Sequence, residues 1–245
     1  MRRSIALVTM TTTLLMAGTA SSFAAESDAA LTKFCDVYFD VSVFFNNSPD
    51  DESSQKEIKA FEKKARVMLN KTQKAAPDDI SGTLDTVVTA FKEDFQTAFE
   101  QPGVAEGVAE LDQYTLENCD YEVIDVTAAD YSFTGLPASV PSGQTVFNMT
   151  NQGTEPHEIV VFRITTDATL EDLLADEDLF DTDTQFIAAA FAEPGDSGSA
   201  YAELKKPGNY VAVCFVPVGT SGDTEGTGPP HFVEGMQAEF TVARA

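Results

Sequence analysis

The stretch YVAVCFVPVGTSGDTEGTGPPHFVEGM, residues 210–236, carries the features that decide how the C-terminal half of this 245-residue chain folds. It begins with an apolar, β-branched run typical of a strand, and this run contains Cys214. A loop rich in glycine, serine and proline follows, and the stretch ends on His231 and Met236. The whole chain has only three cysteines and two histidines. The stretch therefore predicts a strand that leads through a long loop to residue types that can bind a metal.

Most of the chain around this stretch, from residue 121 to residue 242, alternates apolar and polar residues with the period of β-strands. The turns between these runs carry PSG, NQG and KKPGN, so residues 120–245 are expected to form a β-sandwich or barrel. One segment breaks the pattern, because Thr169 and Asp172 fit a capping box and the residues after them look helical. A helical insertion is therefore expected at about residues 166–192. The expected strands are 121–133, 143–151, 157–164, 199–204, 210–215 and 236–242.

The preceding part of the chain, residues 25–119, has the apolar period of helices. Four runs joined by short breaks predict a small antiparallel four-helix bundle. Ser48 is expected to cap the second helix, with Pro49 at its first position. The third helix carries a stripe that is expected to lie in the bundle core. This stripe consists of Phe91, Phe95 and Phe99.

The first 24 residues have the pattern of a signal peptide. Arg2 and Arg3 precede an apolar core that is too short to span a bilayer, and small residues offer a cleavage site after Ala24. No later segment is long and apolar enough to cross a membrane. The chain is therefore expected to be exported, either to a periplasm or to the outside of the cell.

The charge of the chain is strongly negative, with 40 acidic against 15 basic residues and a net charge of −25. Such a surface repels nucleic acid and anionic lipid, and it favours a cationic partner protein. The charge therefore argues against nucleic-acid binding, and it leaves the oligomeric state open.

The cysteines divide into a pair and a single residue. Cys35 lies near the start of the first predicted helix and Cys119 at the end of the fourth, and these ends are neighbours in an up-down bundle. Exported thiols tend to pair, so a Cys35–Cys119 disulfide is expected. Cys214 is left over, and by itself it could be either a buried small apolar residue or a metal ligand.

The two histidines favour the metal ligand. His157 and His231 both lie at strand ends of the predicted sandwich, as does Cys214, and Met236 follows five residues after His231. Two imidazoles, one thiolate and a weak thioether form a trigonal site with a long axial ligand, which suits copper in electron transfer. One copper ion held by these four residues is therefore expected.

These motifs resemble those of the cupredoxins, the plastocyanin- and azurin-like blue copper proteins, over roughly residues 121–242. VPSGQTVFNMTNQGTEPHEIVVF is similar to the strand and turn that lead to the family's first ligand, here His157. LKKPGNYVAVC is similar to the hairpin before the ligand cysteine, and HFVEGMQAEFTV to the second histidine, axial methionine and closing strand. The resemblance implies a Greek-key sandwich with four copper ligands at one end. It also implies that electrons leave near His231, the ligand that usually lies nearest solvent.

The chain departs from the family pattern in two places. Sixteen residues, FVPVGTSGDTEGTGPP, separate Cys214 from His231, where the family usually has only a few. Loop-closure entropy grows slowly with length, so such a loop is tolerable if its ends are fixed. Glu158 stands where many blue copper proteins carry an asparagine that ties the two ligand segments together.

Three functions fit these features. The first is an exported single-copper electron carrier with a redox partner protein; the two histidines leave none for a second copper or a histidine base, so no enzyme activity is expected. The second is a copper delivery or storage module that meets a copper-donor protein, because the long loop could open. The third is a metal-free domain of cupredoxin fold that binds other proteins. The role of the bundle is not indicated by its sequence.

Overall fold

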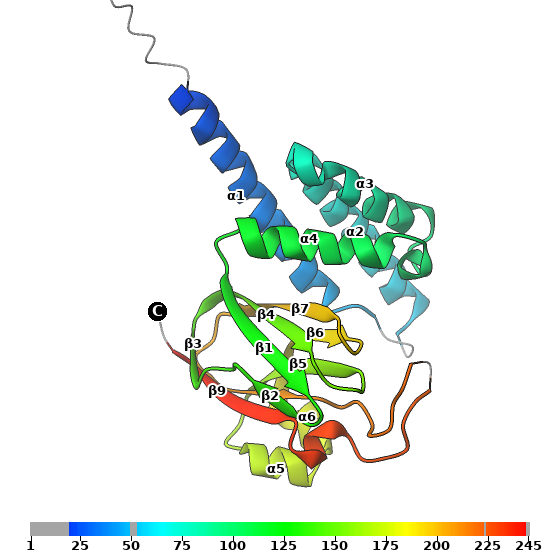
Figure 1. Ribbon diagram of the computed structural model, residues 1–245, viewed down its shortest axis with the longest axis vertical. Helices are drawn as coiled ribbons and strands as arrows, with labels where there is room; N and C mark the ends of the chain where they lie inside the picture. Colours follow the sequence, from blue (N-terminus) through cyan, green and yellow to red (C-terminus); the bar gives the residue numbers. More distant parts are fainter. Residues whose placement is uncertain (1–19, 50–52, 223, 244–245) are drawn as a thin grey trace, which may run out of the picture.

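The computed structural model describes residues 20–49, 53–222 and 224–243, with side chains from residue 28 onward. Four helices come first and pack against one side of a β-sandwich (Figure 1). Residues 1–19 of the predicted signal peptide lie outside the described part, and the first helix is already formed at Ala20. No helix in the described ranges has the length and apolar character that a membrane span requires. The helices are α1 (Ala20–Phe45), α2 (Gln55–Ala75), α3 (Asp78–Glu93) and α4 (Val104–Asn118), with the short 3₁₀ helix η1 (Ala98–Glu100) before α4.

The sandwich consists of two sheets, as the sequence predicts. A four-stranded sheet has the order β2-β1-β4-β7, and a five-stranded sheet has the order β3-β9-β8-β5-β6. Most neighbours are antiparallel, but β1 runs parallel to β4 and β3 runs parallel to β9. The strands are β1 (Glu122–Ala129), β2 (Ser132–Thr134), β3 (Ser139–Pro141), β4 (Gly143–Asn151), β5 (His157–Ile164), β6 (Thr184–Ala192), β7 (Ser197–Leu204), β8 (Gly208–Val213) and β9 (Gln237–Ala243).

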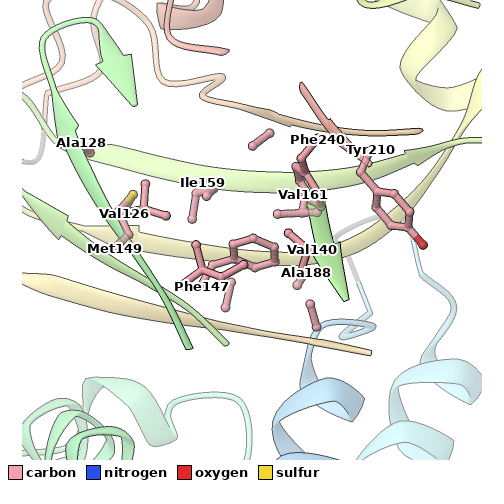
Figure 2. Close-up of a cluster of buried hydrophobic side chains, with 14 of the residues drawn as sticks. Val126, Ala128, Val140, Phe147, Met149, Ile159, Val161, Ala188, Tyr210 and Phe240 are labelled. Carbon is pink, nitrogen blue, oxygen red and sulfur yellow. The ribbon is translucent and has the colours of Figure 1, made fainter. Parts of the chain in front are cut away.

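The core of the sandwich lies between the two sheets (Figure 2). It forms because alternate residues of each strand point to the same face, so an apolar residue at every second position buries one side of the strand. Phe147 and Met149 point inward from β4, and Ile159 and Val161 point inward from β5. The other face of the five-stranded sheet is covered by two short helices, α5 (Leu170–Ala175) and α6 (Asp178–Asp183).

The predicted helical insertion is correct in its first half and wrong in its second. Thr169 and Asp172 form the expected capping box at the start of α5. Residues 184–192, however, form the edge strand β6, which pairs with β5 from His157 opposite Ala192 to Ile164 opposite Thr184. The alanine-rich sequence favours a helix, but the backbone hydrogen bonds offered by β5 outweigh that weak preference.

Two further details of the bundle differ from expectation. Ser54, and not Ser48, caps α2, because Glu57 lies three residues after Ser54 and completes a capping box with it. The Ser48 hydroxyl donates instead to the last residue of α1, Phe45. The stripe of the third helix also ends early, because α3 stops at Glu93 and Phe99 is 60% exposed.

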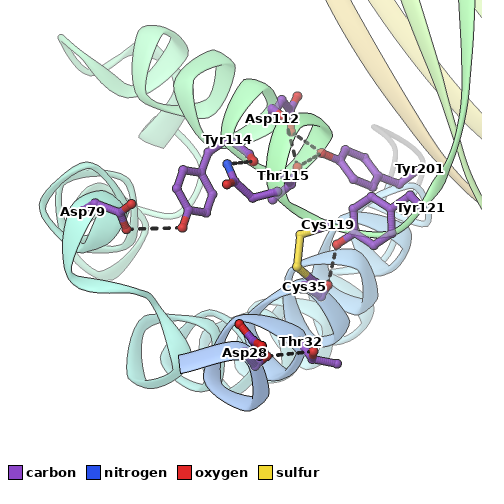
Figure 3. The surroundings of a disulfide bond; sticks show 11 residues. Asp28, Thr32, Cys35, Asp79, Asp112, Tyr114, Thr115, Cys119, Tyr121 and Tyr201 are labelled. Carbon is purple, nitrogen blue, oxygen red and sulfur yellow. Dashed lines mark hydrogen bonds between the residues drawn. A yellow bond between two sulfur atoms is a disulfide. The ribbon is translucent and has the colours of Figure 1, made fainter. Parts of the chain in front are cut away.

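The disulfide between Cys35 and Cys119 joins α1 to the end of α4, as predicted (Figure 3). Its two Cα atoms are 5.6 Å apart. Next to it, the Tyr121 hydroxyl donates to the backbone carbonyl of Cys35 over 2.6 Å. The first residues after the bundle are therefore fixed to α1, which sets where β1 begins.

A buried polar network joins the bundle to the four-stranded sheet. The Asp112 carboxylate on α4 accepts hydrogen bonds from Tyr38 of α1 over 2.8 Å and from Tyr201 of β7 over 2.9 Å. The Tyr201 hydroxyl also lies 2.8 Å from that of Thr115 (Figure 3). Burial raises the pKa of Asp112 to about 6, although the two tyrosine hydrogen bonds act to lower it. The bundle thus packs on the sandwich through specific polar contacts as well as apolar ones.

Candidate metal centre

Three of the four candidate ligands come together at one end of the sandwich. His157 is the first residue of β5, Cys214 follows the last residue of β8, and His231 begins the 3₁₀ helix η2 (His231–Glu234). Since β5 and β8 are neighbouring antiparallel strands, the start of one lies beside the end of the other. All three side chains are fully buried.

The donor atoms of these residues converge. The two Nδ1 atoms of His157 and His231 are 3.0 Å apart, and the Cys214 Sγ lies 3.4 Å from the His231 Nδ1. One ligand atom from each of the three residues can be chosen so that all lie within 4.8 Å of one another. Two imidazole nitrogens at about 2.0 Å from a shared first-row metal would be separated by roughly 3 to 3.5 Å. The spacing therefore fits one metal ion.

Carboxylates hold the outer nitrogens of both rings. The His157 Nε2 lies 2.9 Å from Asp130, and the His231 Nε2 lies 3.0 Å from Glu155. An ionised carboxylate only accepts hydrogen bonds, so in each neutral ring the proton lies on Nε2 and the lone pair on Nδ1. Two lone pairs then face each other across 3.0 Å, an arrangement that a cation between them would satisfy.

The Asp130 and Glu155 carboxylates are both ionised, as hydrogen-bond acceptors for the two Nε2 protons must be. Partial burial acts to raise the pKa of Asp130, but hydrogen bonds from Thr154 and His157 outweigh it and hold the pKa below its usual value. Partial burial also acts to raise the pKa of Glu155. Hydrogen bonds, including one from the Gly219 amide, outweigh this effect and lower the pKa. Both groups are therefore ionised acceptors at neutral pH.

The burial of the site sets the protonation of its ligands. Burial lowers the pKa of His157, which keeps that ring neutral and able to bind a metal. Burial also raises the pKa of the Cys214 thiol to about 12, so the thiol keeps its proton when no metal is bound. A cation that binds here must therefore displace the thiol proton, and its affinity should rise with pH.

The sixteen-residue loop between Cys214 and His231 does not open the site. The loop folds back on itself, with an isolated β-bridge between Pro217 and Pro230. The His231 amide donates to Val216 over 2.9 Å, so the loop closes next to the ligands. At the fifth residue of the loop, the Gly219 amide donates to Glu155 over 2.8 Å. The ends of the long excursion are fixed, as a tolerable loop requires.

Glu158 takes over the tie that an asparagine provides in many blue copper proteins. Its carboxylate accepts a hydrogen bond from the Phe215 amide over 3.0 Å, and its own amide donates to the Cys214 sulfur over 3.5 Å. These two hydrogen bonds connect the segment after His157 to the segment that carries Cys214. Glu158 therefore replaces the asparagine and still links the two ligand segments.

Met236, the fourth candidate ligand, is fully buried and lies in the same core cluster as Cys214. Its amide donates to the His231 carbonyl over 3.0 Å, and its carbonyl accepts from the Cys214 amide over 3.2 Å. These contacts hold its backbone between the two ligands. Its role as the axial ligand stays a prediction.

His231, which the resemblance expects to lie nearest solvent, is buried, as are His157 and Cys214. The His231 side chain is 0% exposed, because Glu155 covers Nε2 and the ring of Tyr131 packs against the imidazole with the ring centres 4.6 Å apart. The Tyr131 hydroxyl donates to Glu155 over 3.0 Å, so it belongs to the same cover. Sequence reasoning missed Asp130, Tyr131 and Glu155, and only the position of Glu155 two residues before His157 hinted at a role.

Neither a protein-family model nor a curated protein sequence matches the chain. Solved structures similar to it include reduced auracyanin from the photosynthetic bacterium Roseiflexus castenholzii, with 23% identity, a TM-score of 0.36, and coverage of 49% of this chain and 96% of that one. Auracyanin A, a blue copper protein from Chloroflexus aurantiacus, has 12% identity, a TM-score of 0.35 and coverage of 49% and 98%. A multicopper oxidase from Pediococcus acidilactici has 10% identity and a TM-score of 0.30, with 51% of this chain matching 27% of the oxidase. Solved blue copper proteins are thus similar to about half of the chain.

Proposed function

We propose that the protein is an exported single-electron carrier that holds one copper ion in the sandwich. His157, Cys214 and His231 would bind the ion, with Met236 as a weak axial ligand. The observation that supports this most strongly is the pair of Nδ1 atoms 3.0 Å apart beside the Cys214 sulfur, with both outer nitrogens held by carboxylates. When bound, copper would supply a one-electron couple between Cu(I) and Cu(II).

The donor set favours copper over the other common first-row metals. A trigonal set of two imidazoles and one thiolate, with a thioether nearby, is typical of blue copper sites, whereas structural zinc takes four strong ligands. The rings and the sulfur are fixed by strands, by Asp130 and Glu155, and by the tie through Glu158. A site held in this way changes little between oxidation states, which suits a carrier.

The proposal extends to partners and location. Both histidines of the chain lie in this one site, so a second copper centre of the kind that multicopper oxidases use has no histidines to draw on. The three candidate ligands are fully buried, so a bound metal would be out of reach of a substrate. This favours electron transfer across the surrounding protein to a docked partner. The disulfide supports an oxidising compartment, periplasmic or extracellular, and the net charge of −25 supports a cationic redox partner.

Metal analysis, voltammetry and chelator exchange on protein purified from a copper-supplied oxidising compartment would test the proposal. A carrier should contain one copper per chain, cycle reversibly by one electron and release Cu(I) slowly to a chelator. Rapid release without a reversible couple would instead identify a delivery module, which the hydrogen-bonded loop does not favour. Protein that holds no copper, and binds none on titration, would leave the metal-free alternative.

A further inference from the structure

The β-sandwich carries a small basic pocket in otherwise acidic surroundings. Only four basic residues follow Cys119 in the sequence, and three of them line one cavity of about 230 Å³. These three are Arg163, Lys205 and Lys206, and Gln185 and Asn47 also line the cavity. Like charges repel one another, so the clustering of three basic side chains around one cavity needs an explanation.

Arg163 lies on the inner face of β5, at the opposite end of that strand from His157. It pairs across the sheet with Tyr210 of β8, which lies at one end of the sandwich core (Figure 2). Six residues of extended strand separate Arg163 from His157, a distance of about 20 Å at roughly 3.3 Å per residue. The pocket is therefore separate from the candidate metal centre.

The guanidinium of Arg163 has no acceptor within the described part of the chain. Its Nε is buried without a hydrogen-bond partner, and none of the three ion pairs found among the described residues involves Arg163. Buried donors are almost always paired, and an arginine has 40 carboxylates to choose from in this protein. An unpaired, partly buried guanidinium that lines a cavity points to an acceptor that is not part of the protein.

The other charged groups of the pocket leave it with a net positive charge, which would attract such an acceptor. Glu203 also lines the cavity, and its carboxylate pairs with Lys205 over 2.5 Å. This pairing leaves Arg163 and Lys206 without a carboxylate partner in the described structure. The Tyr210 hydroxyl donates to the Lys206 carbonyl over 2.7 Å, which fixes the turn that carries both lysines beside Arg163.

We propose that this pocket binds a phosphate group, either as inorganic phosphate or as the phosphate of a small phosphomonoester. The planar guanidinium donates two parallel hydrogen bonds to oxyanions of this kind, and a neighbouring ammonium adds charge for a dianion. The cavity is several times larger than the roughly 30 Å³ that a water molecule occupies, so it has room for the group and a small substituent. The site does not depend on copper.

Calorimetric titration of the full chain, copper-free and copper-loaded, with inorganic phosphate and with glycerol phosphate would test this. Acetate at the same ionic strength is the control ligand. Arg163→Gln should weaken phosphate binding at least tenfold, Lys206→Gln should weaken it less, and Lys71→Gln, an exposed lysine on α2, should leave it unchanged. Tight binding of the phosphomonoester alone would show that the substituent is recognised, and equal binding of both would identify free phosphate as sufficient.

Two results would overturn the proposal. One is phosphate binding that is the same in the wild type and in Arg163→Gln, and the other is equal binding of phosphate and acetate. Without any anion, Arg163→Gln should be at least as stable to urea as the wild type, because it removes a partly buried charge that has no partner. If Arg163→Gln failed to fold, Lys206→Gln would still decide, since unchanged phosphate binding in that variant would count against the pocket. A failure of copper binding would not affect any of these outcomes.

Discussion

The Glu155 carboxylate holds His231 from outside the metal centre, with the ring Nε2 and the Gly219 amide both bonded to its Oε2 atom, at 3.0 Å and 2.8 Å. The other oxygen accepts the Tyr131 hydroxyl. One side chain thus orients a candidate ligand, fixes the long loop at Gly219 and anchors the Tyr131 ring that covers His231. We expect the affinity and geometry of the site to depend on it.

Replacing Glu155 by alanine should weaken Cu(II) binding by about 10- to 100-fold, as loss of an outer partner of a ligating histidine typically does. Glu155→Gln keeps an acceptor oxygen and should recover much of the loss. Competition with a chelator of known affinity measures both. The matched control is Glu93→Ala, at an exposed glutamate that ends α3 in the helical bundle. Equal losses in Glu155→Ala and Glu93→Ala would show that Glu155 does not support the metal.

Glu158 should matter for folding even without copper. Glu158→Leu removes the acceptor of the Phe215 amide and leaves that donor unpaired, which should cost about 1–3 kcal/mol in the free energy of unfolding. Glu158→Gln retains an acceptor and should cost less. Urea unfolding of the copper-free protein measures both variants. A leucine variant as stable as the wild type would show that the tie contributes nothing.

The disulfide should provide a large part of the stability. The bond closes a loop with a sequence separation of 84 residues, for which the chain-entropy relation gives about 4–5 kcal/mol at 25 °C. The double variant Cys35→Ser, Cys119→Ser should therefore unfold at much lower urea than the wild type. Adding a reductant should shift the wild type to the same midpoint and leave the double variant unchanged. If the reductant lowered the urea midpoint of both proteins equally, loss of this disulfide could not be the cause of the shift.

Asp112 should make stability fall as pH rises between about 4 and 6. Its pKa is raised in the folded protein to about 6, above the value of 3.8 for an unperturbed aspartate. The folded state therefore holds the proton more tightly, so this stabilisation is complete below pH 4 and lost above pH 6. About two pKa units correspond to about 2–3 kcal/mol. The difference in unfolding free energy between wild type and Asp112→Asn, measured across this range, should change by this amount; a constant difference would contradict it.

The sequence predicts the local elements well where one pattern dominates. The bounds of β4 and β5 match the expected strands residue for residue. The predicted pairing of Cys35 with Cys119 is confirmed, although Cys35 lies well inside α1 (Ala20–Phe45) and not near its start. The meeting of His157, Cys214 and His231 was also expected, because strand ends gather at one end of a sandwich. Metal ligation by these residues stays a prediction.

What the sequence did not predict depends on contacts between distant segments. Strand β6 forms because β5 offers it hydrogen bonds, against its own helical preference. Asp130 meets His157 across 27 positions in the sequence, and Glu155 meets His231 across 76. No periodicity or spacing encodes such pairs, so the covered position of His231 could be found only from the fold.

The most direct test of the copper assignment is the visible absorption spectrum of the copper-free protein titrated with Cu(II), with Cys214→Ser as the matched variant. We expect an intense blue thiolate-to-copper band that saturates at one equivalent in the wild type and is absent in Cys214→Ser. A wild type with no such band, or a variant with the same band, would contradict the assignment of Cys214 as a copper ligand.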